Sequence, residues 1–211
     1  MIAADVGTAP EDPGAGEPTD GRTARAQRTR DAIVEACVSL VQAGDIRPTA
    51  PRIAEEAGVS VRSVFQHFDD LETLFTLVAE RSVSGLGGLV RRIDPGLAFD
   101  ERVDRFVRQR ADLLEAVTPA RRAASVHAPF SPAIRASVEA GHKFLRAQLA
   151  EVFAVELDAV AEPAAEQVLD MLDVATTWAS WDVLRHLEGR SVDESAAVVA
   201  ALVRCVLGGA R

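Results

Sequence analysis

The chain has 211 residues, of which 48% are hydrophobic, and it carries a formal net charge of −9. This length and hydrophobic share suffice for one medium or two small domains with a buried core, and the acidic balance excludes a protein that binds nucleic acid over its whole surface. No run of about 18 apolar residues predicts a membrane span, and the first residues do not have the basic start and apolar stretch of a signal peptide. We therefore expect a cytoplasmic protein that does not contact membranes.

Residues 1–21 differ in composition from the sequence that follows. They are rich in Gly, Pro and Ala and contain five acids but no base, so they are expected to be disordered. Between Arg22 and His67 the balance reverses, because seven arginines face five acids and give this region a net charge of +2. Such a local excess in an acidic chain is expected if this region alone meets a polyanion.

Three helices are predicted in the basic region. The first covers residues 25–43 and ends at Gly44; the apolar residues that carry its spacing are Ile33, Val34, Cys37, Leu40 and Val41. The stretch IAEEAGVSVRSVFQHF, residues 53–68, predicts the other two. A helix over residues 50–57 is capped by Thr49, Gly58 provides the turn, and Ser60 caps the next helix. Ala54 is small where the two helices must cross closely, as in a helix-turn-helix.

The last of these helices has two distinct faces when it is drawn at 100° per residue. We expect the apolar face to anchor the helix to its domain; it comprises Val61, Val64, Phe65 and Phe68. The opposite face carries hydrogen-bond donors, which a recognition helix needs to contact base edges and phosphates in the major groove; it comprises Arg62, Ser63, Gln66 and His67. The alternative is an ordinary surface helix with a solvated polar face. The glycine turn, the small Ala54 and the upstream arginines favour DNA binding.

Residues 28–74 resemble the TetR-type transcriptional regulators. The resemblance lies in "PTA", in "IAEEAGVS", and in an aromatic-x-His-Phe sequence followed by Leu six residues later. It implies a DNA-binding domain over residues 22–75 and a helical ligand-binding and dimerisation domain over 76–211. It also implies a homodimer that binds a palindromic double-stranded operator as a repressor and is released by a hydrophobic small molecule. A regulator without a small ligand, controlled by a protein partner or by its abundance, remains an alternative.

The resemblance also places candidate DNA contacts on this sequence. They are Arg28, Thr49, Arg52, Ser60, Arg62, Ser63, Gln66 and His67. Arg22, Arg25 and Arg28 form either an arm that reaches the backbone or minor groove or an unstructured basic segment. Two phosphate contacts expected from the family are missing, because Phe65 replaces a tyrosine and Leu71 a lysine.

The rest of the chain also predicts helices, about nine in total, with no alternating strand pattern, so the fold class is all-α. A connecting helix over residues 71–93 is weakened in its latter part by Gly85, Gly87 and Gly88. Thr118-Pro119 and Ser131-Pro132 each predict a helix start, and Ser191 with Glu194 predicts a capping box before the last helix, residues 192–207.

Two helices, over residues 163–187 and 192–207, are apolar on nearly all sides and therefore predict burial on both sides. Pairing them with their copies in a four-helix bundle buries the apolar patches that a monomer would expose. The expected dimer residues are Val168, Leu172, Ala175, Ala179, Val199, Leu202 and Val206.

A ligand pocket is expected among the large side chains of the second domain, and it should be mostly apolar. The candidates are Phe106, His127, Phe130, Phe144, Trp178 and Trp181. No cofactor or metal site is predicted, because the four histidines have no metal-ligand spacing. No catalytic constellation is visible, so we do not expect an enzyme. Cys37 and Cys205 are expected to be buried free thiols.

Overall fold

The computed structural model describes residues 19–84, 86–161 and 163–209, and it contains helices and no strand over these ranges. This confirms the all-α class. The elements in chain order are α1 (Thr19–Gln42), α2 (Ala50–Glu56), α3 (Val61–His67), α4 (Leu71–Ser84), the 3-10 helix η1 (Gly87–Leu89), α5 (Phe99–His127), α6 (Pro132–Val152), α7 (Ala154–Asp158), α8 (Ala164–Thr176), α9 (Trp178–Asp182), the π-helical segment η2 (Val183–Leu187) and α10 (Val192–Gly209).

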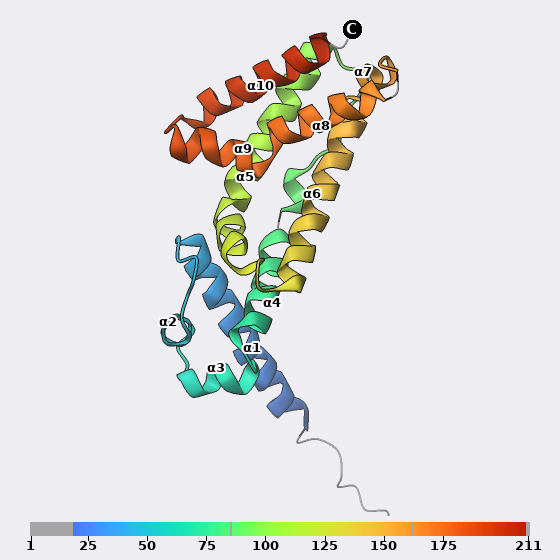
Figure 1. Cartoon of the computed structure of the whole chain (residues 1–211). Helices are drawn as coiled ribbons and strands as arrows, with labels where there is room; N and C mark the ends of the chain where they lie inside the picture. The colour runs from blue at the N-terminus through green and yellow to red at the C-terminus, as the bar shows by residue number, and fades with distance from the viewer. Residues whose placement is uncertain (1–18, 85, 162, 210–211) are drawn as a thin grey trace, which may run out of the picture.

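Helices α1–α3 form one end of the molecule, and α5–α10 form the other end (Figure 1). The N-terminal core comprises Ile33, Val34, Cys37, Leu40, Val41, Ile53, Ala54, Val64, Phe68, Leu74 and Val78. The last two belong to α4, so this core extends three residues beyond the boundary predicted at residue 75. Helix α1 begins at Thr19 rather than at residue 25, so residues 19–21 are helical and not disordered. Residues 1–18 lie outside the described part of the chain.

Helix α5 lies at the centre of the C-terminal end, where it packs against α6, α9 and α10. Its buried residues Phe106 and Leu114 contribute to a core that also includes Leu149, Leu172 and Val203. An ion pair between Arg102 and Glu156, both almost fully buried, joins α5 to α7. Burial of a charge is tolerated when it is paired in this way.

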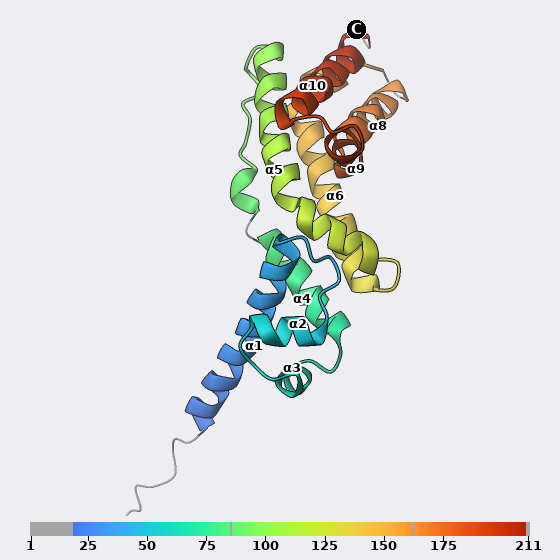
Figure 2. The ribbon, with the colours of Figure 1, turned by 90° about the vertical axis from the view of Figure 1, so that its left-hand side faces the viewer.

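The helix start predicted at Thr118-Pro119 is wrong, because α5 runs through Pro119 without a break. The Thr118 hydroxyl does not cap a helix but donates to the Leu114 carbonyl oxygen at 2.6 Å. Proline inside a helix removes a hydrogen bond and bends the helix, and α5 changes direction towards its C-terminal end (Figure 2). The dipeptide Thr118-Pro119 is thus compatible with the start of a helix or with a kink inside one. Packing of the helix on both sides of this dipeptide favours the kink.

The single helix predicted over residues 163–187 is interrupted at Thr177. This residue has extended backbone angles (φ −71°, ψ 160°), and its side chain accepts a hydrogen bond from the Ser180 N–H. It therefore ends α8 and caps α9. The chain then continues as the π-helical segment η2.

The other predicted helix boundaries have mixed outcomes. The connecting helix α4 ends at Ser84 and not at residue 93, and Gly85 lies outside the described residues. Ser131 caps α6 as predicted. The capping box before α10 is also confirmed, because the Ser191 N–H donates to the Glu194 carboxylate at 2.7 Å and the Glu194 N–H donates to the Ser191 hydroxyl at 3.1 Å. None of the helices in the described ranges is both long and apolar enough to cross a membrane.

Candidate functional site

The predicted turn between α2 and α3 is confirmed in detail. Gly58 has φ 65°, a value that glycine adopts at little cost. The Val59 N–H donates to the Ala54 carbonyl at 2.9 Å, and the Ser63 N–H donates to the Ser60 hydroxyl at 3.1 Å. These bonds end one helix and start the next within four residues.

The anchoring face of α3 is narrower than the sequence predicts. Val64 and Phe68 are buried, with 0% and 2% exposure, but Val61 and Phe65 are 39% and 49% exposed. A helix of two turns that rests on α1 and α2 buries one line of residues, and Val64 and Phe68 are four positions apart on that line. Phe65 is therefore part of the outward surface of α3, next to Gln66.

Arg30 of α1, which was not among the predicted site residues, fixes the C-terminal end of α3. Its guanidinium donates to the His67 carbonyl oxygen at 2.5 Å and lies 4.3 Å from the centroid of the Phe68 ring. His67 is thus held through its main chain. A signal was present in the sequence, since Arg30 precedes Ile33 and Val34 by one helical turn on the inner side of α1.

The outward surface of α3 presents Arg62 and Gln66, which are both exposed. Ser63 and His67, predicted on the same face, are half-buried. Among the candidates outside α3, Thr49 occupies the cap position of α2 and is exposed, but its side chain makes no cap hydrogen bond.

The basic residues around α3 are exposed as well. Arg52 forms an exposed ion pair with Glu55 at 3.2 Å, so it would have to leave this carboxylate to bind a phosphate. Arg22, Arg25 and Arg28 are exposed and lie in the first turns of α1, so they do not form an unstructured segment. These turns extend beyond α3 at the same end of the molecule (Figures 1 and 2).

A cavity of about 550 Å³ lies in the C-terminal end of the molecule, with walls from α4, η1, α5, α6, α8 and α9. Its volume is in the range typical of sites for small molecules. The apolar part of the wall comprises Leu86, Val90, Leu113, Leu114, Val117, Ile134, Val138 and Leu145.

Two of the six predicted pocket residues, Phe144 and Trp178, line this cavity. Phe106 is buried in the core against Phe153, with ring centroids 5.3 Å apart. Trp181 is also buried, and its indole N–H donates to the Glu115 carboxylate at 2.7 Å. Phe130 is 83% exposed. Periodicity does not distinguish an aromatic residue that lines a cavity from one that fills a core.

The sixth candidate, His127, lies at the junction of the two ends of the molecule and not in the cavity. Its ring contacts the Phe75 ring of α4 with centroids 4.3 Å apart. It also adjoins Ile46 and Pro48, which precede α2. Burial lowers the pKa of His127, so the neutral imidazole is favoured here.

One corner of the cavity is polar and was not predicted. The Arg110 guanidinium donates to the carbonyl oxygens of Thr176 (3.4 Å) and Leu145 (3.0 Å) and to the Gln148 side chain (2.9 Å). Burial lowers the pKa of Arg110 to about 10, and the neighbouring Asp173 opposes this shift. The sequence signal was an arginine in the apolar stripe of α5.

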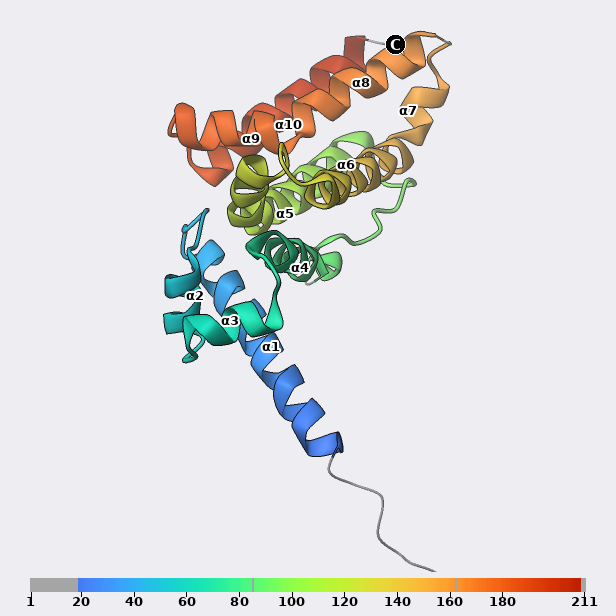
Figure 3. The same cartoon turned by 60° about the horizontal axis from the view of Figure 1, so that its bottom comes forward.

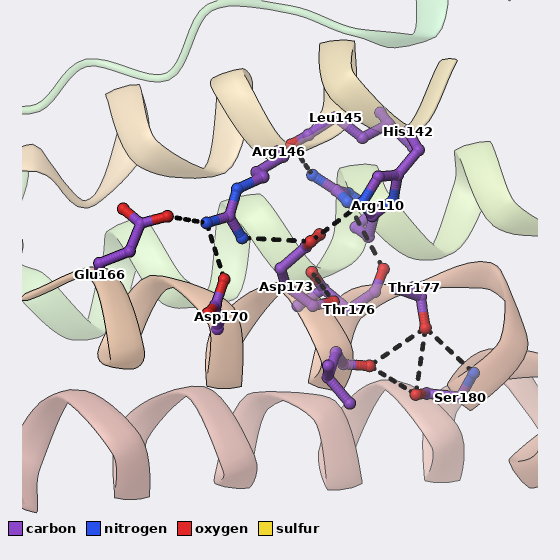
Figure 4. A network of polar contacts seen from close by, with 11 residues as sticks. Arg110, His142, Leu145, Arg146, Glu166, Asp170, Asp173, Thr176, Thr177 and Ser180 are labelled. Atoms are coloured by element: carbon purple, nitrogen blue, oxygen red, sulfur yellow. Dashed lines mark hydrogen bonds and ion pairs between the residues drawn. The ribbon is translucent and has the colours of Figure 1, made fainter. Parts of the chain in front are cut away.

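Asp173 is itself held by two further side chains from α6. His142 Nε2 lies 3.1 Å and an Arg146 terminal nitrogen 3.3 Å from one carboxylate oxygen of Asp173 (Figure 4). Arg146 also pairs with Glu166 and Asp170 at 2.6 and 2.8 Å. The network joins α6 to α8 and engages the Asp173 carboxylate with the side chains of His142 and Arg146.

Three of the predicted dimer residues belong to the core of their own chain. The exposed fractions are 8% for Val168, 0% for Leu172 and 3% for Val199, and all three pack inside the C-terminal core. The sides of α8 and α10 that carry these residues therefore face the interior of their own chain. Ala175 and Val206 are half-buried, while Ala179 and Leu202 are exposed.

The other side of α8 and α10 is exposed and apolar. It comprises Met171, Val174, Ala201, Leu202 and Cys205. Cys205 was expected to be buried and is exposed, whereas Cys37 is buried as predicted. The two helices lie side by side at the end of the molecule away from α2 and α3 (Figures 1 and 3).

No protein-family model and no curated protein matches the chain, but solved structures do. A TetR-family transcriptional regulator from Streptomyces coelicolor is 19% identical with a TM-score of 0.63, over 86% of this chain and 89% of its own. A TetR transcription regulator from Haloarcula marismortui is 17% identical with a TM-score of 0.60, over 87% and 98%. The multidrug binding protein EbrR, complexed with ethidium, is 19% identical with a TM-score of 0.56, over 82% and 98%. The chain therefore has the fold of the TetR-family transcriptional regulators.

Proposed function

We propose that this protein is a DNA-binding transcriptional repressor that binds a palindromic operator as a homodimer and is released when a small molecule fills the cavity. The proposal rests on the way in which α3 is held against the rest of the protein. Its inner side is fixed by Val64, Phe68 and the Arg30 hydrogen bond, while Arg62 and Gln66 point away from the protein. A short helix held in this way suits insertion into the major groove, where Arg pairs with guanine and Gln with adenine.

The distribution of charge supports the same proposal. The exposed arginines of α1 lie at the same end as α3, in a chain whose net charge is −9. Phosphate contacts from such residues give affinity without sequence preference and make binding depend on salt. Phe65 and Leu71 do not supply the charge or hydroxyl that bind phosphates, so this dependence should be modest.

The cavity favours control by a small molecule over control by a protein partner or by abundance alone. It lies against α4, which also contributes Leu74 and Val78 to the N-terminal core. A ligand that binds better to one position of α4 shifts the population of DNA-competent dimers, and coupling of this kind is typically about 1–3 kcal/mol. EbrR, of similar fold, was solved with ethidium.

The proposal is tested by titrating the full-length protein against fluorescent duplexes from the DNA that flanks its own gene. We expect one palindromic site to bind far more tightly than scrambled DNA, at a stoichiometry of two chains per site. Absence of any preferred sequence would contradict the regulator. Preferred binding that never changes across a broad library of small molecules would instead support the regulator without a ligand.

A further inference from the structure

Two cations in the cavity wall have no carboxylate partner among the described residues, the half-buried Arg121 and the exposed Lys143. Of the two, Arg121 is the one held inside the protein. Arg121 of α5 is half-buried, and its guanidinium lies 5.3 Å from the centroid of the Trp178 ring. No carboxylate in the described part of the chain forms an ion pair with it. Burial lowers its pKa, with no opposing contribution from an acid.

The other two arginines near the cavity differ from Arg121 in this respect. Arg110 makes three hydrogen bonds and lies near Asp173. Arg146, behind the wall, pairs with three carboxylates. Two carboxylates also line the cavity. Asp173 is already engaged by His142 and Arg146, so it offers little net attraction for a cationic ligand, and Glu139 is exposed.

Arg121 and Trp178 are held as a unit. The Trp178 indole N–H donates to the Thr118 hydroxyl at 3.1 Å, and that hydroxyl in turn donates to the Leu114 carbonyl at 2.6 Å. Thr118 and Arg121 flank the proline kink of α5, while Trp178 opens α9 after the break at Thr177. The kink and the break thus bring a guanidinium and an indole ring together at an apolar cavity.

We propose that the ligand of this cavity is an amphipathic organic anion whose carboxylate pairs with Arg121 and whose apolar part packs against Leu113, Val117 and Val138. A guanidinium forms two parallel hydrogen bonds with a carboxylate, and such a pair is strong where water is partly excluded. This inference names the ligand class for the regulator proposed above, and it rests on that proposal only for the effect on DNA.

The inference is tested by measuring the binding of small ligands to the protein directly, without DNA. Decanoate, methyl decanoate and decyltrimethylammonium share one alkyl chain and differ in the charge of the head. Each is titrated into the full-length protein, below its micelle concentration, by calorimetry and by tryptophan fluorescence. We expect decanoate to bind most tightly, and Arg121→Gln to lose about tenfold or more of the decanoate affinity with little change for the ester.

The matched control is Arg108→Gln, which removes the same charge from an exposed position of α5 outside the cavity wall. Arg121→Lys keeps the charge but not the paired hydrogen bonds, so its decanoate affinity should be intermediate. The inference is overturned if the ester or the ammonium compound binds as tightly as decanoate, or if Arg121→Gln binds decanoate as Arg108→Gln does. Decanoate binding that leaves operator affinity unchanged would count against the proposed release mechanism and not against the anion site.

Discussion

The residues of α3 fall into two groups with different environments, one buried and one exposed. Val64 and Phe68 are buried and hold the helix in place, whereas Arg62 and Gln66 are exposed and their side chains make no hydrogen bond that the structure describes. Substitutions in the two groups should therefore have different effects on stability and on DNA binding. The exposed pair should affect DNA binding alone, because no packing is lost with these side chains.

Arg62→Ala and Gln66→Ala should each leave the thermal unfolding transition unchanged. Each should cost about 1–3 kcal/mol of operator binding and relax the preference at one base pair per half-site, because one base contact is lost. Operator titration with base-substituted duplexes measures both effects. Wild-type affinity for either variant would mean that this polar surface is merely solvated.

Arg28 and Arg30 provide a matched pair two residues apart on α1. Arg30→Ala removes the bond to the His67 carbonyl and the contact with Phe68, so we expect a loss of about 2 kcal/mol in the free energy of unfolding. Arg28→Ala should keep the stability and should weaken binding to all DNA sequences with a smaller salt dependence. Urea unfolding and titration at several salt concentrations separate the two. Equal stability of both variants would show that Arg30 does not anchor α3.

At the scale of elements, two irregular helices shape the cavity. The Pro119 kink directs the last turns of α5 towards α4, and the break at Thr177 sets Trp178 and Ala179 into the wall. Straight helices over these residues would leave the Trp178 ring in a different position relative to α5. The irregularities therefore shape the wall of the proposed binding site.

The capping role of Thr177 is tested by Thr177→Ala. This change removes the acceptor for the Ser180 N–H, and we expect a cost of about 1 kcal/mol in the free energy of unfolding. Thr177→Ser keeps the acceptor and should recover most of that stability. Urea unfolding provides the measurement, and an alanine variant as stable as the serine variant would contradict the role of the cap.

At the scale of the whole molecule, two hydrophobic cores are joined through α4 and the end of α5, and an apolar face remains exposed on α8 and α10. Met171, Val174 and Leu202 on that face are 55%, 66% and 44% exposed. Exposed apolar residues that lie together on a protein surface mark an interaction surface. We predict that a second copy of the chain, related by a two-fold axis and presenting the same face, covers it.

Leu202→Glu should therefore convert the dimer into a monomer, because an unpaired charge in an apolar interface is costly. Sedimentation at micromolar concentration should show twice 22.5 kDa for the wild type and 22.5 kDa for the variant. Leu89→Glu, at a similarly exposed site outside α8 and α10, is the control and should remain dimeric. A monomeric wild type would contradict the interface.

Thiol labelling gives a second measurement of the same face. Burial raises the pKa of Cys37 to about 12, so this thiol should not react in the folded protein. Cys205 is exposed in the single chain and should react faster in Leu202→Glu than in the wild type. Equal rates would place Cys205 outside the contact.

The sequence by itself determined the all-helical class, the starts of α2 and α3, the turn at Gly58 and the caps at Ser60, Ser131 and Ser191. These features depend on interactions between residues close together in the chain, such as a positive φ or a hydroxyl that accepts from an N–H three residues ahead. For the same reason the resemblance of residues 28–74 to TetR-type regulators could be recognised before any tertiary contact was known.

Tertiary structure alone decided which apolar side chains fill a core and which face a cavity or solvent. Phe106 lies on α5 and is buried, Phe144 lies on α6 and lines the cavity, and Phe130 lies in the turn between these helices and is exposed. Tertiary structure also decided that Thr118-Pro119 is a kink and that Thr177 is a break. Each choice depends on the free energy of packing against distant helices, which outweighs the local preferences of a short segment.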